Sequence, residues 1–213
     1  MPAQDPDEHR HGTEHHWNPP EETEAKVRAL ESLLVEAGVL TPADIDQMVD
    51  EFETNLGPMN GAKVVAKAWV DPAYRERLLA DASTAIEELG FRGLQTEVVV
   101  AVENSPTVHH MVVCTLCSCY PWTLLGIPPT WFKDNAYRSR SVLEPRSVLA
   151  DFGVTLGPDV EVKVWDTSAE VRYLVIPQRP AGTEQMAEAE LADLVTRDSM
   201  LGVGFALAPE AVG

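Results

Sequence analysis

The sequence predicts an α+β fold in which an N-terminal helical arm is followed by a layered α/β/β/α-type domain. Apolar residues recur at helical spacing through most of the first ninety positions. Beyond Gly93 the pattern changes to valine-rich and alternating segments, which are typical of strands. Helical patterns also occur after these strands, so we expect the strands to form two packed layers with helices on the outside.

The composition indicates one medium-sized domain with an arm. The chain has 213 residues, of which 45% are hydrophobic, so it can bury a core. Sixteen Lys and Arg against 34 Asp and Glu give a formal net charge of -18, which disfavours nucleic acid and anionic membrane surfaces as partners. No apolar run approaches the roughly 20 residues of a membrane span, and no secretory signal begins the chain. We therefore expect a cytoplasmic protein.

Three segments are expected along the chain. Residues 1–20 read as a flexible, acidic, histidine-containing tail, since they hold four prolines and almost no apolar residues. A metal-binding histidine tract is the alternative reading of this tail. Residues 21–92 form the helical arm, and residues 93–213 form the metal-binding α+β domain.

The arm is predicted to contain four helices. The first runs from Glu22 to Ala37 with Gly38 as its C-cap, and the second starts at Thr41-Pro42 with an apolar stripe reaching Phe52. A short third helix covers residues 61–70. The fourth opens at Asp71-Pro72 and closes at Gly90, with these residues facing inward: Tyr74, Leu78, Leu79, Ala82, Ile86 and Leu89.

The second half of the chain mixes strands, turns and helices. Its strand patterns cover 96–103, 107–113, 160–164 and 173–175, and residues 166–170 are predicted to join the last two as a hairpin. A turn-rich segment is expected at 121–129. Helical stretches are expected at 130–152, with an interruption at Pro145, and a last helix is expected at 188–197.

The candidate site is a group of three cysteines, Cys114, Cys117 and Cys119, with the spacing C-x-x-C-x-C. An odd number of clustered cysteines is not a disulfide framework and indicates metal binding or redox chemistry. A structural zinc site needs a fourth ligand, and the nearby candidates are His109 and His110. Neighbouring strand residues point to opposite faces, so at most one of these rings can reach the cysteines. An iron–sulfur cluster normally needs four thiolates, and the chain has three.

Chelate geometry offers another solution. If the sulfurs of Cys117 and Cys119 bind one ion, the amide nitrogens of Ser118 and Cys119 lie between them and close one six-membered and two five-membered rings. These atoms form an equatorial N2S2 plane, Cys114 supplies an axial thiolate, and a sixth position stays open. Amide nitrogens bind only when deprotonated, so we infer a trivalent, low-spin ion. Such ions exchange ligands slowly, so loading needs help.

The run from Cys114 to Trp122 strongly resembles the metal-binding segment of nitrile hydratase α subunits. The resemblance extends over most of residues 21–203, and further matching segments are Asn55-Leu56-Gly57-Pro58, Gly61 to Lys67, Trp69 to Pro72, Pro128 to Trp131, Tyr137 to Arg140, Pro177 to Thr183 and Arg197-Asp198-Ser199.

This resemblance implies hydration of nitriles to amides by a non-corrin cobalt(III) or non-haem iron(III) centre. It implies a sulfinate at Cys117, a sulfenate at Cys119 and a thiolate at Cys114, with amide nitrogens from Ser118 and Cys119. Thr115 resembles the cobalt-type motif, because iron-type members tend to carry serine there.

The resemblance also implies a catalytic set around the metal. Besides Cys117 and Cys119 it includes Trp122 as a pocket aromatic, Gln95 as a hydrogen-bonding residue near the ligands and Tyr120 beside the metal. A buried Trp, a strand-edge Gln and a loop-covering Tyr are the alternative readings. Attack on the nitrile carbon by the Cys119 sulfenate oxygen or by metal-activated water remains open. One departure from the family pattern is Thr123, which stands where proline is usual.

Partners follow from the same resemblance. A β subunit is implied, in an αβ or α2β2 heteromer, with its arginines bonded to the oxidised sulfurs. The uncovered apolar stripes of the arm favour such a partner, and slow ligand exchange suggests an activator protein that loads the metal. The metal-bearing subunit of thiocyanate hydrolase is an enzymatic alternative, against which Tyr120-Pro121 and Gln178-Arg179-Pro180 favour nitriles. A non-catalytic metal-storage or delivery protein is the other alternative.

Overall fold

The computed structural model describes residues 21–54, 56–91 and 98–209, and the chain divides into two compact units. The first unit extends to Glu51 and the second begins at Phe52. Within its described residues the first unit contains α1 (Glu21–Glu36) and most of α2 (Pro42–Thr54). The predicted tail, 1–20, lies outside the described residues.

The helices of the first unit begin and end where the sequence predicts. Gly38, after α1, adopts a φ of 66°, which a glycine tolerates without strain. At the start of α2 the Asp44 carboxylate accepts from the Thr41 backbone at 2.8 Å, and the Thr41 hydroxyl accepts from the Asp44 N–H at 3.2 Å. The apolar stripes lie open within this unit, since these side chains are about half exposed or more: Val27, Leu30, Leu33, Met48 and Val49.

Three helices open the second unit: α3 (Pro58–Val70), α4 (Pro72–Ala80) and α5 (Ala82–Glu87). The prediction of one helix over 71–89 is wrong, because the helix ends before Asp81 and a second helix begins after it. The Asp81 carboxylate accepts from the N–H and hydroxyl of Thr84 at 3.1 and 2.8 Å, which starts a new helix. Leu79 was expected inside but is 38% exposed. Its neighbour Leu78 takes the core position, and adjacent helix residues point about 100° apart.

Within the described ranges, four strands form two separate parallel sheets. β1 (Val98–Glu103) pairs with β4 (Val171–Ile176), and β2 (Val108–Val113) pairs with β3 (Glu161–Asp166). Helices α4 and α5 contact β1, which groups the last helices predicted for the arm with the strands. The division after residue 92 stays a prediction about domain organisation. The two packed strand layers are confirmed.

The predicted hairpin at 166–170 is wrong. β3 and β4 belong to different sheets, so this segment crosses from one layer to the other. Thr167 continues the pairing with β2 through an N–H bond to the Val113 carbonyl at 2.8 Å, and the Glu170 carbonyl accepts from Val98 at 2.8 Å. Parallel neighbours in one sheet need a crossover of a dozen residues or more, so a link this short excludes a parallel pairing of β3 with β4. We call residues 166–172 the crossover segment.

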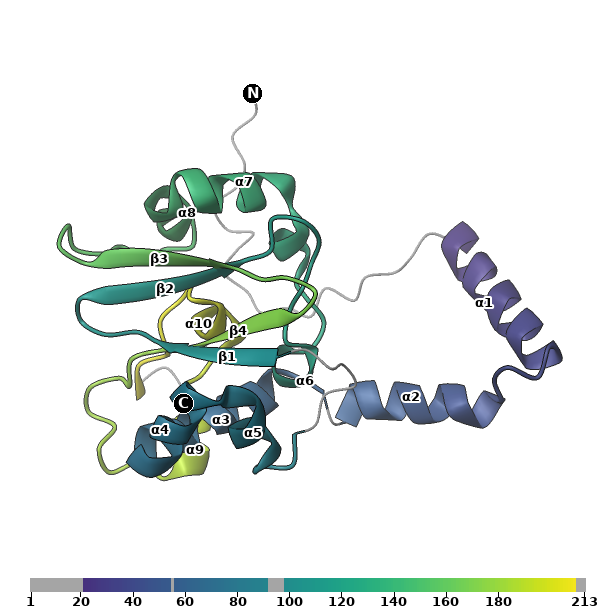
Figure 1. Ribbon diagram of the computed structural model, residues 1–213, viewed down its shortest axis with the longest axis horizontal. Helices are drawn as coiled ribbons and strands as arrows, with labels where there is room; N and C mark the ends of the chain where they lie inside the picture. Colours follow the sequence, from purple (N-terminus) through teal and green to yellow (C-terminus); the bar gives the residue numbers. More distant parts are fainter. Residues whose placement is uncertain (1–20, 55, 92–97, 210–213) are drawn as a thin grey trace. The chain divides into compact units, whose positions relative to one another are not determined.

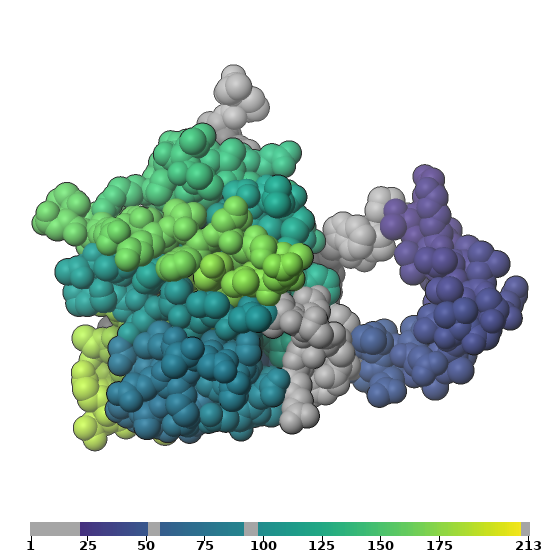
Figure 2. Space-filling model, viewed as in Figure 1, coloured from purple at the N-terminus to yellow at the C-terminus, as the bar shows by residue number. Residues whose placement is uncertain are grey.

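Helices cover both sheets. Figure 1 shows α7 and α8 beyond the β2–β3 sheet and α3, α4, α5 and α9 beyond the β1–β4 sheet, which gives the predicted α/β/β/α layering of this unit. In the space-filling view α7 and α8, in green, and α3 to α5, in blue, lie at opposite ends of this unit (Figure 2). The helices after β2 are α6 (Trp122–Leu125), the 3-10 helix η2 (Thr130–Lys133), α7 (Asn135–Leu143), α8 (Pro145–Asp151), α9 (Glu188–Ala192) and α10 (Arg197–Leu201).

Two sequence predictions about these helices have different outcomes. The interruption at Pro145 is confirmed, since this residue begins α8. The single helix over 188–197 is wrong, because α9 ends at Ala192 and the Thr196 hydroxyl starts α10 by accepting from the Ser199 N–H at 3.1 Å. Among the described helices none is long and apolar enough to cross a membrane.

Two buried histidines anchor β2 to its surroundings. His109 Nε2 lies 2.7 Å from the carbonyl oxygen of Gly202, and His110 Nδ1 accepts from Trp165 Nε1 at 2.7 Å. Gly202 has a φ of 75°, and a Cβ on it would lie 1.8 Å from the His110 carbonyl oxygen, so only glycine fits there. These contacts hold in place the strand that leads into the cysteines.

We expect the protein to lose stability as pH falls through the range in which free histidine titrates. Burial lowers the pKa of both His109 and His110, and the Lys163 ammonium lowers that of His110 further. The unfolded chain therefore binds protons first, at about pH 6.5, and folding stability falls as pH drops towards the lower folded-state values. Protonating His110 Nδ1 also breaks its bond from Trp165.

Thermal unfolding at about pH 5 and about pH 8 measures this effect. The double variant His109→Gln/His110→Gln should show a weaker pH dependence than the parent chain. An equal change in melting temperature with pH in both proteins would show that the histidines contribute nothing to it.

Candidate metal centre

The three cysteine sulfurs converge on one point directly after β2. The Sγ atoms of Cys114 and Cys117 lie 3.4 Å apart, those of Cys117 and Cys119 lie 2.9 Å apart, and all three fall within 4.8 Å of one another. Cys114 is buried, Cys119 half-buried and Cys117 exposed, so the group opens from the core towards the surface. The local spacing predicted this arrangement, because a six-residue loop keeps its side chains together.

The thiols have different proton affinities. The Cys117 and Cys119 sulfurs share a hydrogen bond, and this bond, together with one from Cys114 and the backbone of the loop, lowers the pKa of Cys117 to about 7. Burial, followed by the same shared proton, raises the pKa of Cys119 to about 12. A cation that binds both sulfurs displaces this shared proton.

Two residues of the crossover segment hold the cysteine loop in this shape. The Asp166 carboxylate accepts from the backbone N–H and the hydroxyl of Thr115 at 2.9 and 2.5 Å. The buried Thr167 hydroxyl donates to the carbonyl of Cys119 at 2.7 Å. The loop is thus fixed near both ends by a segment that lies about fifty residues later in the sequence.

Asp166 and Thr167 lie beside the site although the sequence pattern alone did not indicate them. Asp166 is the register partner of Val113, the residue before Cys114. Because parallel strands end at the same edge of a sheet, parallel pairing of β3 with β2 brings the end of β3 beside the cysteines. The signal in the sequence was that the strand now seen as β3 ends in a carboxylate, Asp166. The prediction of a hairpin at 166–170 assigned this residue to a turn instead.

Neither candidate histidine joins the cysteines. Within the described part of the chain, these three thiols are the only group of three or more His, Cys, Asp or Glu side chains that could hold a metal ion. His109 contacts Gly202 and Asn104, and His110 contacts Trp165, so both ring systems are engaged elsewhere. The described side chains thus supply no fourth ligand for a structural zinc site.

The other predicted site residues occupy different environments. Tyr120 is buried, its hydroxyl donates to the Leu125 carbonyl at 3.2 Å, and its ring meets that of Phe132 edge-on. Trp122 is half-buried at the start of α6 and packs against the core. Gln95 lies outside the described residues. Catalytic roles for these three residues stay predictions.

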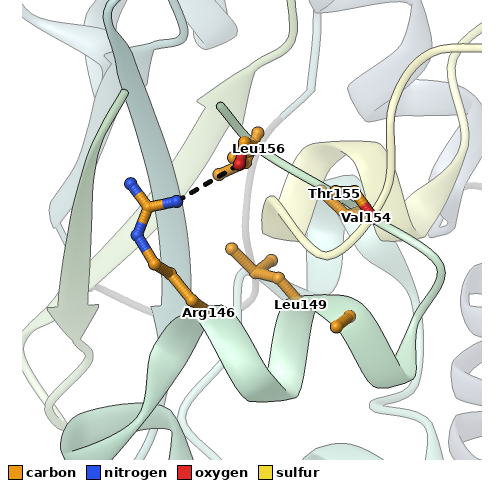
Figure 3. A pocket seen from close by; sticks show the side chains of 6 residues that line it. Arg146, Leu149, Val154, Thr155 and Leu156 are labelled. Atoms are coloured by element: carbon orange, nitrogen blue, oxygen red, sulfur yellow. Dashed lines mark hydrogen bonds between the residues drawn. The ribbon is translucent and has the colours of Figure 1, made fainter. Parts of the chain in front are cut away.

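A separate cavity of about 190 Å³ lies between α8 and the segment that follows it. Leu149, Val154 and Leu156 line it, and Arg146 borders it (Figure 3). The Arg146 guanidinium donates to the carbonyls of Leu156, Gly157 and Val160, so its charge is used to close this turn. The cavity contains none of the cysteines and is not the candidate centre.

The donor set fits a thiophilic ion. Soft thiolate sulfur selects such ions, and the three sulfurs already lie close enough to share one. The loop also offers the backbone nitrogens of Ser118 and Cys119 between two of the sulfurs. Fold and site together define an α+β protein in which one short cysteine loop brings together three sulfurs that could hold a metal ion.

Comparisons with known proteins identify the family. The family model described as "Nitrile hydratase, alpha chain" matches residues 21–204. The cobalt-containing nitrile hydratase subunit alpha of Pseudonocardia thermophila is 57% identical over 183 residues, covering 85% of this chain and 90% of that one. The low-molecular weight cobalt-containing subunit alpha of Rhodococcus rhodochrous is 56% identical over 189 residues, with 89% and 91% covered. The chain therefore belongs to the nitrile hydratase alpha chain family.

Structural comparison agrees with this assignment. A solved double histidine variant of the Fe-type nitrile hydratase from Comamonas testosteroni Ni1 matches with a TM-score of 0.84 and 40% identity, covering 90% of this chain and 94% of that one. The thiocyanate hydrolase subunit gamma of Thiobacillus thioparus is a weaker match, at 39% identity over 186 residues, with 82% and 76% covered.

Proposed function

We propose that this chain is the metal-bearing α subunit of a cobalt-type nitrile hydratase, which hydrates nitriles to the corresponding amides. The observation that carries the proposal is the convergence of three cysteine sulfurs within 4.8 Å in a chain of this family. Cobalt(III) is the proposed ion, one per chain, because the matched relatives with 56 and 57% identity are cobalt-containing proteins. Iron(III) is the alternative ion.

The proposed ligands are the sulfurs of Cys114, Cys117 and Cys119 and the amide nitrogens of Ser118 and Cys119. A bound low-spin cobalt(III) supplies Lewis acidity, which polarises a nitrile or lowers the pKa of water. The lowered pKa of Cys117 favours its thiolate, which is the form of cysteine that binds a metal ion. The buried sulfur of Cys114 keeps water away from the inner side of the site.

The surrounding residues orient this loop and bound the substrate. Thr167 fixes the carbonyl of Cys119, the residue whose own backbone nitrogen is the second proposed amide ligand. We propose Trp122 as a wall of the substrate pocket, since it follows the loop directly and remains half-buried. Tyr120 anchors the loop in the core through its packing against Phe132. Gln95 is proposed to hydrogen-bond near the ligands.

A β subunit is the proposed partner, in an αβ or α2β2 heteromer. Support comes from the first unit, whose apolar side chains lie exposed within it and suit burial against another chain. The net charge of -18 also favours arginines from a second chain near the anionic sulfurs. An activator protein is proposed for metal loading. The proposed location is the cytoplasm, whose thiol pool keeps clustered cysteines reduced until they are loaded.

The decisive test is turnover by the cobalt-loaded chain with and without its β subunit. Acrylonitrile should be converted to acrylamide by the heteromer, at least about a hundredfold faster than thiocyanate is hydrolysed, and the isolated chain should be inactive. The reason is that burying anionic sulfurs without counter-charge costs several kcal/mol.

Each other result points to a different function. Faster turnover of thiocyanate than of acrylonitrile would identify a thiocyanate hydrolase subunit. Stoichiometric cobalt with no turnover of any nitrile by the heteromer would support metal storage or delivery. Equal activity of the isolated chain and the mixture, with no heteromer by light scattering, would show that the site is complete within one chain.

Oxidation of the ligand cysteines is a second expectation. Mass spectrometry of the peptide that spans Cys114 to Cys119 should show two added oxygens on Cys117, and one on Cys119 after trapping with a sulfenate reagent. A sulfinate is a poorer donor than a thiolate, so oxidation raises the Lewis acidity of the ion. Full activity with both sulfurs unmodified would contradict this expectation.

A further inference from the structure

The one-turn helix α6, which begins at Trp122, is held in place by side chains from distant parts of the chain. Trp122 follows Cys119 by three positions and is half-buried against the core. Isolated helices of fewer than about 12 residues are marginal in water, so a helix of four residues does not fix its own orientation. The contacts that other elements make with α6 therefore decide where the Trp122 ring lies.

Two carbonyl groups of α6 accept hydrogen bonds from other helices. Asn60 Nδ2, on α3, donates to the Thr123 carbonyl at 2.9 Å, and Arg197 Nε, on α10, donates to the Leu125 carbonyl at 3.1 Å. The last four carbonyls of a helix have no partner within the regular helical pattern. These donors, 63 residues before and 72 residues after their acceptors, therefore satisfy groups that a single turn leaves open.

A close approach of the backbones accompanies the bond from Asn60. The Asn60 side chain is 9% exposed, so little water competes for its amide. The next residue is Gly61, and a Cβ on it would lie 2.7 Å from the Leu124 carbonyl oxygen, so α3 and α6 touch without a side chain between them. Without the amide donor, the Thr123 carbonyl lacks this partner, which favours a shift of α6 away from α3 and towards water.

We propose that Asn60 is a positioning residue for Trp122 and thereby determines which nitriles the enzyme accepts. It acts by holding α6 at the Thr123 carbonyl, one residue after the ring that forms the proposed wall of the substrate pocket. The inference rests on the proposed nitrile hydratase function and adds a residue of α3 to those that shape the pocket. A nitrile large enough to lean on the indole ring depends on Asn60 more than a small nitrile does.

The test measures kcat and KM of cobalt-loaded heteromers for acrylonitrile and for the larger benzonitrile. Asn60→Leu keeps the approximate size of the side chain and removes the donor. One methylene of pocket space is typically worth about tenfold in discrimination, so N60L should lower the benzonitrile-to-acrylonitrile ratio of kcat/KM about tenfold, through the KM for benzonitrile. A merely structural role of Asn60 would instead lower the turnover of both nitriles together and leave the ratio unchanged.

A double-variant cycle with Trp122→Ala shows whether the effect passes through the indole ring. Effects of independent sites add, whereas effects of two residues that act through one structure do not. When Trp122 is already alanine, N60L should therefore change the ratio by less than about twofold, which is the usual scatter of additive sites. A change in the ratio that persists undiminished in the Trp122→Ala background would overturn the proposal.

A matched control is Arg146→Met, which also removes a side chain that closes a turn by donating to backbone carbonyls, here those of Leu156 and Gly157. It should leave the ratio at the parental value. A folded N60L variant with the parental ratio would contradict the role of Asn60. If N60L does not fold, Asn60→Asp, which keeps the shape and removes the donor, replaces it, and a parental ratio in N60D is equally contradictory.

The same measurements separate the two levels of inference. If the parent heteromer hydrates both nitriles and the variants keep its ratio, only the role of Asn60 is rejected. If the cobalt-loaded parent hydrates neither nitrile, the proposed function fails, and the role of Asn60 is overturned with it.

Discussion

Replacing any one of the three cysteines by alanine should abolish cobalt binding and nitrile turnover while the helices and sheets persist. Each change removes one sulfur from a chelate whose other donors depend on it, as the 2.9 and 3.4 Å spacings of the sulfurs indicate. We expect turnover to fall by more than about a hundredfold, which is more than is typical when a residue that hydrogen-bonds to a metal ligand is changed. Elemental analysis, turnover and circular dichroism of Cys114→Ala, Cys117→Ala and Cys119→Ala make the comparison.

A matched control lies inside the same loop. The side chain of Leu116 is 87% exposed and offers no donor atom, so Leu116→Ala should retain cobalt. The amide ligand can be tested at Ser118, because alanine keeps the backbone N–H whereas proline removes it. Ser118→Ala should bind cobalt and Ser118→Pro should not. A Cys119→Ala protein with full cobalt occupancy and unchanged turnover would contradict the ligand scheme.

Cobalt supply should decide whether the enzyme is active. Protein produced in iron-rich medium without cobalt is expected to show at most about a tenth of the turnover obtained with cobalt, since a low-spin ion is fixed in place once loaded and exchanges slowly. The measurement is metal content together with acrylonitrile turnover for both preparations. Stoichiometric iron with full activity would show that the ion assignment is wrong.

Thr115 supplies the matched variant for this experiment. Its hydroxyl donates to Asp166 at 2.5 Å, and a serine can make the same bond, so the methyl group is what distinguishes the two residues at this position. Thr115→Ser tests the methyl group, and Thr115→Val tests the hydrogen bond. If the residue type contributes to ion choice, Thr115→Ser should incorporate more iron in mixed medium, whereas Thr115→Val should bind less of either metal.

The local sequence pattern was sufficient to predict a structural feature wherever the contacts that form that feature join residues close in sequence. The helix at Pro42 follows from Thr41 and Asp44, which bond each other across one turn. The three sulfurs follow from C-x-x-C-x-C in the same way, because the short loop keeps them together whatever the rest of the chain does. Periodicity failed at Asp81, where a side chain that caps a helix competes with continuation of the apolar stripe.

Only the tertiary structure decided which strands are neighbours. Alternation predicts that β3 and β4 are strands but carries no information on pairing, and a four-residue link between them suggested a hairpin. Parallel pairing of each with an earlier strand places Asp166, Thr167 and Arg172 against the cysteine loop. The sequence by itself therefore predicted the candidate ligands, because that prediction depends on six consecutive residues. The residues that hold the cysteine loop come from a segment about fifty positions away. Their approach depends on packing of the two sheets, which local pattern does not encode.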